Sequence, residues 1–140
     1  LRIGVGSAPL LQRTRDLLRP GGSAHFLTPA GDWAGLGLVK DGWWMLEDPT
    51  HIRFFTADSL ARAAQEAGFV DVEVRRLLLD SLSVDAASIA RALRPGSRPR
   101  GVLGARPVLA GAVASLPLVV AQRLVSPRSR PTLQLLARRP

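Results

Sequence analysis

The chain has 140 residues, of which 46% are hydrophobic and 21% charged, proportions of a globular protein rather than a disordered one. Cysteine is absent, which excludes disulfide frameworks and thiolate metal sites, and with two histidines we expect no metal site. The net charge is +8, but residues 1–85 hold 9 basic and 11 acidic residues, whereas residues 86–140 hold 10 arginines and no acid. No aromatic residue lies among those arginines to stack on bases, so we expect a solvated basic face and no nucleic-acid binding.

The first elements are an apolar run, a helix and a strand. LRIGVGS indicates the end of a strand and the loop that follows it. Glycine, proline and arginine soon interrupt this apolar run, so it does not have the pattern of a signal peptide. We therefore expect a cytoplasmic protein. The chain begins with Leu1 instead of methionine, which we interpret as a fragment or a processed product. Residues 10–19 carry leucines at helical spacing and end at Pro-Gly-Gly. SAHFLTP, residues 23–29, then predicts a buried strand in which His25 is structural.

Residues 30–50 are rich in glycine, aspartate and tryptophan and predict a long irregular segment. Long loops inside compact domains are usually functional. Trp43, Trp44 and Met45 either line a pocket for an apolar substrate or anchor the loop on the core, and both interpretations stay open.

The next stretch predicts a capped helix and an alternating strand. Thr56 suits the N-cap position, the apolar residues that follow repeat at helical spacing, and Gly68 ends the pattern. Valines then alternate with charged residues over 70–75, which indicates a strand with one buried and one solvated face.

The last third of the chain differs in composition, with arginines, prolines and apolar stretches. Ser83 is placed to cap a short helix, and TLQLLA, residues 132–137, predicts a closing strand. Residues 107–121 carry no charge but are fewer than the ~20 that a membrane-spanning helix needs, and Pro117 interrupts them. They indicate a helix that covers the sheet or a cleft; a membrane-surface contact assisted by the flanking arginines is the alternative.

Several of these motifs resemble class I S-adenosylmethionine-dependent methyltransferases, in particular methyltransferase type 11/12-like domains. LLRPGGSAHFLTP is similar to the helix end, turn and fifth strand of that family, HIRFFTADSLARAAQEAGFVDVEV to its next helix and sixth strand, and LQLLARRP to its last strand. The resemblance covers about residues 8–78 and 131–140. The resemblance is more specific than a single motif would be, because several motifs occur in the same order as in the family.

The resemblance implies an α/β fold with part of a Rossmann-like sheet. The family's strand order is 3-2-1-4-5-7-6, and this chain would supply strands 4, 5, 7 and 6, the last strand in sequence being antiparallel. Residues 1–79 and 131–140 would form the C-terminal half of the methyltransferase domain, and residues 80–130 a helical, arginine-rich insertion that acts as a lid or an interface.

The resemblance also implies S-adenosylmethionine as cofactor, held on a glycine-rich loop with an acid about 20 residues further on. Gly4 and Gly6 are the only candidates for that loop, but Pro9 follows at once and the region at the expected spacing is His25-Phe26. We therefore expect the cofactor-binding half to be missing from the chain, and the chain alone to be inactive.

For the intact enzyme we expect methyl transfer to a small-molecule acceptor, with nucleophile and methyl carbon held in line. His51 is the candidate base, because imidazole suits proton transfer near neutral pH and the family often has a histidine here; the alternative is a structural bond to loop backbone. Trp43, Trp44 and Arg53 are the candidate substrate-binding residues, and an apolar acceptor would lie against residues 108–125. Two alternatives stay open: a non-catalytic remnant acting as a binding or dimerisation module, and a basic protein peripheral to membranes.

Overall fold

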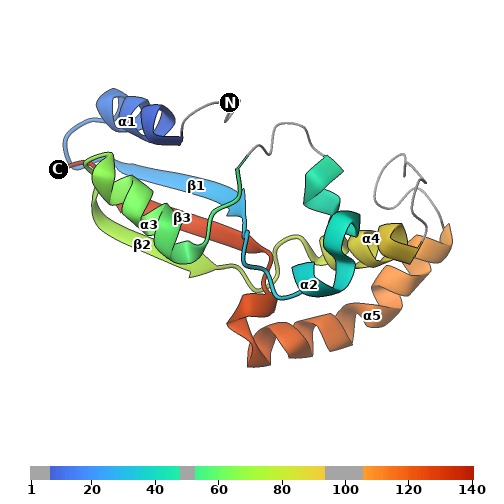
Figure 1. Cartoon of the computed structure of the whole chain (residues 1–140). Helices are drawn as coiled ribbons and strands as arrows, with labels where there is room; N and C mark the ends of the chain where they lie inside the picture. The colour runs from blue at the N-terminus through green and yellow to red at the C-terminus, as the bar shows by residue number, and fades with distance from the viewer. Residues whose placement is uncertain (1–6, 48–52, 94–105) are drawn as a thin grey trace. The chain divides into compact units, whose positions relative to one another are not determined.

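The structure is a computed structural model of the chain, and the residues that it describes are 7–47, 53–93 and 106–140 (Figure 1). The described residues form two compact units. The first unit comprises residues 7–31, 53–77 and 132–140, and the second comprises residues 32–47, 78–93 and 106–131. The expected strand end at residues 1–6, with Gly4 and Gly6, lies outside the described residues.

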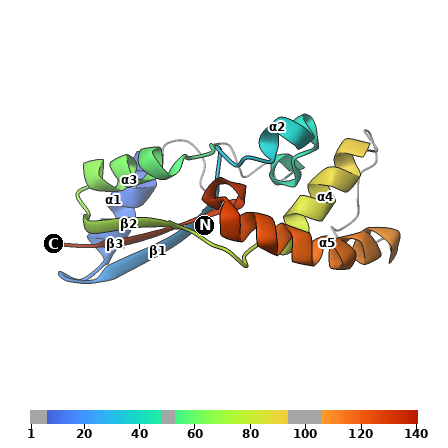
Figure 2. The ribbon, with the colours of Figure 1, turned by 90° about the horizontal axis from the view of Figure 1, so that it is seen from below.

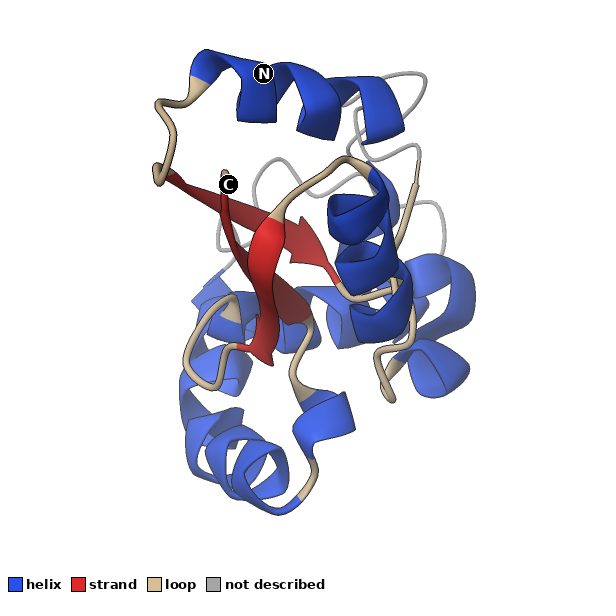
Figure 3. Ribbon diagram, turned by 90° about the vertical axis from the view of Figure 1, so that its left-hand side faces the viewer, coloured by secondary structure: helices blue, strands red, loops and turns tan. Residues whose placement is uncertain are grey.

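The first unit is built on three described strands, β1 (Ser23–Pro29), β2 (Val70–Arg76) and β3 (Thr132–Arg138), drawn in red in Figure 3. Their order is β1-β3-β2, and β3 is antiparallel to both neighbours. Leu135 of β3 lies opposite Phe26 of β1 and Val74 of β2. The three predicted strands and the antiparallel direction of the last one are thereby confirmed, whereas the full Rossmann-like strand order stays a prediction.

Two helices, α1 (Ser7–Leu17) and α3 (Ala57–Glu66), lie on one face of this sheet (Figure 2). Their apolar side chains and those of β3 form a core in which Leu11, Leu60, Ala64, Leu133 and Leu135 are at most 4% exposed. The spacing of the leucines predicts that all of them face the core, but Leu17, at the end of α1, is 81% exposed. The buried face of α1 is therefore narrower than its sequence predicts.

Helix α3 begins and ends as its sequence predicts. The hydroxyl of Thr56 accepts a hydrogen bond from the backbone N–H of Ser59 (3.1 Å), and the hydroxyl of Ser59 accepts one from the N–H of Thr56 (2.9 Å). This reciprocal capping box satisfies two N–H groups that have no partner inside the helix. Gly68 follows the helix with φ +84°, a conformation that glycine adopts without steric cost.

The Pro-Gly-Gly turn joins α1 to β1 and is held from the other end of the chain. The N–H of Gly22 donates to the carbonyl of Arg19 (2.8 Å), and Gly21 has φ +75°, as the third residue of a type II turn requires. The guanidinium of Arg139 donates to the carbonyls of Asp16 (3.1 Å) and Leu18. Helix α1 thus gains partners for carbonyls that its own turns leave unpaired.

The sheet is less buried than its sequence suggests. The prediction that residues 23–29 form a buried strand is wrong: Ala24 and Pro29 are buried, but His25 is exposed and Leu27 is 58% exposed. The physical reason is that α1 and α3 cover one face only, and alternate residues of a strand point to opposite faces.

Strand β2 also departs from the expected simple alternation. Its register against β3 shifts between Val70 and Glu73, so two residues of β2 stand opposite Ala137. Asp71, at this bulge, has φ +50°. A β-bulge moves the preceding side chain to the other face, and Val70 accordingly shares the face of Glu73 and is 42% exposed.

The second unit is helical. The segment predicted to be irregular contains α2 (Leu36–Val39) and two short 3-10 helices, η1 (Lys40–Gly42) and η2 (Trp44–Glu47). Helices α4 (Leu82–Leu93) and α5 (Arg106–Val125) pack on one another, and η3 (Pro127–Ser129) leads to β3. Because α4 already begins at Leu82, Ser83 lies inside the helix and does not cap it. Among the described helices, none combines the length and apolarity that crossing a membrane requires.

Candidate functional site

Arg53, one of the predicted substrate-binding residues, lies beside the carboxyl end of β1. Ala30 forms a parallel bridge with Phe55, and the N–H of Gly31 donates to the Phe55 carbonyl (2.8 Å). A Cβ at Gly31 would lie 2.8 Å from the Cβ of Phe54, so glycine is required for this approach. Arg53 is exposed there. The predicted base, His51, lies outside the described residues.

The tryptophan pair belongs to the second unit. Trp43 is 1% exposed, and its ring stacks on that of Trp33 with centroids 6.0 Å apart and 24° between the planes. The backbone N–H of Trp44 donates to the hydroxyl of Ser88 in α4 (3.0 Å). Trp43 therefore anchors its segment in the core, which is the second of the two interpretations offered by the sequence, and it supports Trp33 from behind.

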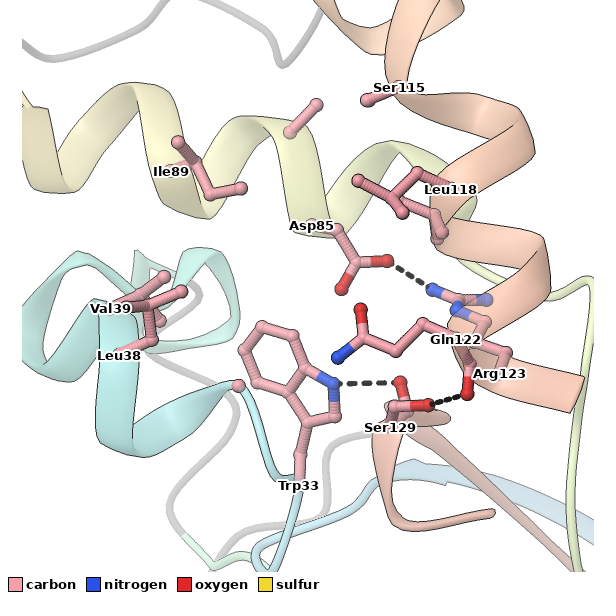
Figure 4. Close-up of a pocket in the computed structure, with 13 residues that line it drawn as sticks. Trp33, Leu38, Val39, Asp85, Ile89, Ser115, Leu118, Gln122, Arg123 and Ser129 are labelled. Atoms are coloured by element: carbon pink, nitrogen blue, oxygen red, sulfur yellow. Dashed lines mark hydrogen bonds and ion pairs between the residues drawn. The ribbon is translucent and has the colours of Figure 1, made fainter. Parts of the chain in front are cut away.

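Trp33 forms part of the wall of a cavity of about 160 Å³ inside the second unit (Figure 4). The cavity lies between α2, α4 and α5, and apolar side chains make up most of its wall. Those side chains are Trp33, Leu38, Val39, Ala86, Ile89, Leu118 and Val119. Asp85 and Gln122 add a carboxylate and an amide to it. Ligand sites in proteins combine a largely apolar wall with a few placed polar groups in this way.

The carboxylate of Asp85 is paired with the guanidinium of Arg123, at 2.5 Å between Oδ2 and Nη2. The side chain of Arg123 is 1% exposed and that of Asp85 14%. Arg123 also donates to the backbone carbonyls of Leu78 (2.9 Å) and Asp80 (2.7 Å), which lie ahead of α4. The expectation of a solvated basic face is therefore wrong for Arg123, whose charge is used inside the protein.

The two environments of Asp85 act against each other on its pKa. Burial raises the pKa of the carboxyl, because a charged carboxylate loses hydration in a poorly solvated site. The positive charge and the hydrogen bond of Arg123 lower it, but the pKa remains above its ordinary value. Arg123 thus offsets part of the cost of keeping a charged carboxylate at the cavity.

The indole of Trp33 is fixed in its orientation by contacts on several sides. Its Nε1–H donates to the carbonyl of Ser129 (3.0 Å), and the Ser129 hydroxyl donates to the carbonyl of Ser126 (2.6 Å). A Cβ at Gly35 would collide with the indole ring, so the chain passes this ring only with glycine at that position. The aromatic wall of the cavity is therefore rigid.

Trp33, Asp85 and Gln122 are not among the residues that the sequence predicts to be functional. One feature of the sequence predicts an ion pair for Asp85: it is the last acidic residue before a long stretch whose only charged residues are arginines. That partner, however, is 38 residues away in the chain.

The described residues do not fit a cradle for S-adenosylmethionine. A glycine that approaches a ligand leaves space where its Cβ would be. At Gly22, Gly31 and Gly42 a Cβ would instead lie 2.8 Å from other atoms of this chain, and Gly37 and Gly111, where a Cβ would meet nothing within 4 Å, lie inside α2 and α5 and not in a turn. Beyond β1, the chain continues to Trp33 and the short helices of the second unit, without the glycine-rich turn into a long helix that the cofactor's binding motif needs.

One of three comparisons with known proteins found a match. Residues 7–74 match the family model of a methyltransferase domain. No curated protein and no solved structure was found to match the chain. The matched residues contain α1, β1, α3 and most of β2, and the order of helix, strand, helix and strand in the first unit is consistent with such a domain. The match supports a methyltransferase domain over residues 7–74 of this chain.

Proposed function

We propose that this chain is part of an S-adenosylmethionine-dependent methyltransferase that acts on a small, largely apolar acceptor. The observation that carries the proposal is the methyltransferase domain over residues 7–74. The apolar cavity supports the second part, because residues 115–123 of α5, within the stretch where an apolar acceptor was expected, contribute to its wall. We assign the acceptor to this cavity.

We propose His51 as the base that takes up the proton of the acceptor, and Arg53, exposed beside the end of β1, as a contact for a polar part of the substrate. Trp43 acts through Trp33, on which it stacks. Because the described residues form no cradle for the cofactor, we propose that other residues bind S-adenosylmethionine and that the 140-residue chain alone is inactive.

The test is a pair of measurements on two proteins. The 140-residue chain and the longest polypeptide that its reading frame encodes are each titrated with S-adenosylmethionine in a calorimeter. They are then incubated with S-adenosylmethionine tritiated in the methyl group and with a panel of small hydroxylated and amine acceptors. We expect no saturable binding and no transfer with the 140-residue chain, and both with the longer polypeptide.

Two outcomes would count against the proposal in different ways. Tight binding of the cofactor to the 140-residue chain would show that the proposal that this chain alone lacks the cofactor site is wrong. If the longer polypeptide binds no cofactor and transfers no methyl group to any acceptor, the methyltransferase assignment itself is wrong.

A second candidate function is a non-catalytic binding module. It is favoured by the coexistence of a preformed cavity and the lack of a fitting cofactor cradle among the described residues. The same two proteins separate the candidates, because a binding module retains affinity for small apolar molecules without methyl transfer at any length of chain.

A further inference from the structure

The cavity of the second unit carries more information about its ligand than its apolar wall alone. Oδ2 of Asp85 bonds to Arg123, whereas no donor among the described residues is bonded to Oδ1. The side-chain amide of Gln122 likewise has no hydrogen bond to any described residue. Figure 4 shows the Asp85 carboxylate and the Gln122 amide pointing into the space beside the Trp33 indole.

We infer that this cavity binds a neutral, ring-sized molecule through a hydroxyl group that donates a hydrogen bond to Asp85. The inference rests on the proposed function in one respect, since it names the chemical class of the acceptor: a small aromatic or alicyclic alcohol or phenol. Asp85 is then the residue that selects for the hydroxyl, and Gln122 supports it.

The charged groups that line the cavity favour a neutral ligand. An ionised carboxylate only accepts hydrogen bonds, so its free oxygen calls for a donor and rejects an anion. A cationic amine is also disfavoured, because Asp85 is already neutralised by the guanidinium of Arg123 at 2.5 Å and a second cation would be repelled by it. A hydroxyl satisfies the carboxylate without adding charge.

The size and walls of the cavity decide the rest of the ligand. Its volume of about 160 Å³ is close to that of the engineered cavity of roughly 150 Å³ that accommodates benzene. One wall is the Trp33 indole, held by the hydrogen bond to Ser129 and by the stacking of Trp43. Because Trp33 is only 5% exposed, a ring in the cavity contacts the small accessible part of the indole together with the exposed side chains of Leu38 and Leu118, which are 79% and 73% exposed.

Phenol and its methyl ether, anisole, are the matched probes. They share a ring and differ in that anisole has no hydrogen to donate. The 140-residue chain is labelled with ¹⁵N, and binding is followed by the indole N–H signal of Trp33, which a Trp33→Phe variant identifies among the three tryptophans. We expect phenol to shift this signal in a saturable manner. Anisole should bind about 10- to 100-fold more weakly, the range that a hydrogen bond to a charged group provides.

Two variants identify the site and the group responsible. Replacing Asp85 alone leaves Arg123 buried without its counter-charge, so the pair is replaced together as Asp85→Leu with Arg123→Met, which well-packed proteins tolerate. This double variant should bind phenol and anisole with equal affinity. Ala86→Leu, which adds a larger side chain to the cavity wall, should weaken both probes alike.

Equal affinity of the wild-type protein for phenol and anisole would overturn the inference, and so would shifts confined to the signals of Trp43 and Trp44. The first reading needs only the wild-type protein, and the second adds only the Trp33→Phe variant that assigns the signals, so both hold even if the double variant fails to fold. Phenol selectivity without methyl transfer by the longer polypeptide would leave the inference standing and remove the proposed function. Methyl transfer without phenol selectivity would do the reverse.

Discussion

Replacing Arg123 by methionine tests whether a single buried guanidinium holds the second unit together. The Arg123 side chain is 1% exposed and donates to the carbonyls of Leu78 and Asp80 and, at 2.5 Å, to the carboxylate of Asp85. Methionine keeps an unbranched apolar chain of similar length and removes all of these donors. It also leaves the largely buried carboxylate without its counter-charge.

The expected loss of stability comes mainly from breaking the ion pair with Asp85, and less from the lost hydrogen bonds to the two carbonyls. Removing one partner of a buried ion pair costs about 3–5 kcal/mol, because the other charge stays buried and uncompensated. The two carbonyls lie where water can replace part of the lost bonding, since their contacts with Arg123 are only partly buried. Such contributions also do not add within one network. We therefore expect the free energy of unfolding of the second unit to fall by about 3–5 kcal/mol.

The assay uses the fact that Trp33, Trp43 and Trp44, the only tryptophans, all lie in the second unit. Tryptophan fluorescence in a urea titration therefore reports the unfolding of this unit, while far-ultraviolet circular dichroism reports both units. Arg128→Met is the matched control, because Arg128 is exposed, and it should change stability by less than about 0.5 kcal/mol. If Arg123→Met lowers the urea midpoint no more than this control does, the ion pair does not stabilise the unit as argued.

The same variant should depend on pH in a defined direction. Burial raises the pKa of Asp85 above its ordinary value of 3.8, and removing Arg123 raises it further, because the positive charge that lowers it is gone. Between the unfolded and the raised folded pKa, the folded state binds more protons than the unfolded state, so stability falls as the pH rises through that window. The deficit of Arg123→Met relative to wild type should therefore shrink as the pH falls. An equal deficit at both ends of the window would contradict the charge argument.

Three further substitutions address single features. Trp43→Ala should destabilise the second unit by about 3–5 kcal/mol, because it empties a fully buried site, and the urea midpoint by circular dichroism measures it; an unchanged midpoint would place the ring at the surface. Thr56→Ala should cost the first unit about 1 kcal/mol by removing the helix cap, whereas Thr56→Ser should retain most of it in the same titration. Gly68→Ala should cost about 1–3 kcal/mol, because its φ of +84° strains any other residue and the new Cβ would meet the Arg15 guanidinium; Gly37→Ala, where a Cβ meets nothing within 4 Å, is the control.

Local sequence patterns predicted the elements of the first unit well. The cap at Thr56, the stop at Gly68 and the Pro-Gly-Gly turn depend on contacts within four residues of each other, so the residues that make them can be recognised in the sequence. The same holds for the valines of β2, whose alternation indicates a strand wherever the strand lies.

The exposure of those elements was predicted less well, because burial depends on what covers a face. Leu17, Leu27 and Val70 are apolar residues in regular positions, yet each is more than 40% exposed. The bulge at Asp71 reverses one side chain relative to the pattern, and nothing in the alternation signals it. A prediction from periodicity assumes a partner for every apolar face, and only the packed structure tells which faces have one.

The sequence alone thus determined which segments are helices and strands, how several of them begin and end, and the methyltransferase resemblance, since these depend on neighbouring residues. Only the tertiary structure showed that β3 pairs between β1 and β2, that residues 32–47 join α4 and α5 in a second unit, and that Asp85 meets Arg123 at the wall of a cavity. Those features join residues from 38 to more than 100 positions apart. Their formation depends on the burial and charge balance of the whole fold, which no local pattern contains.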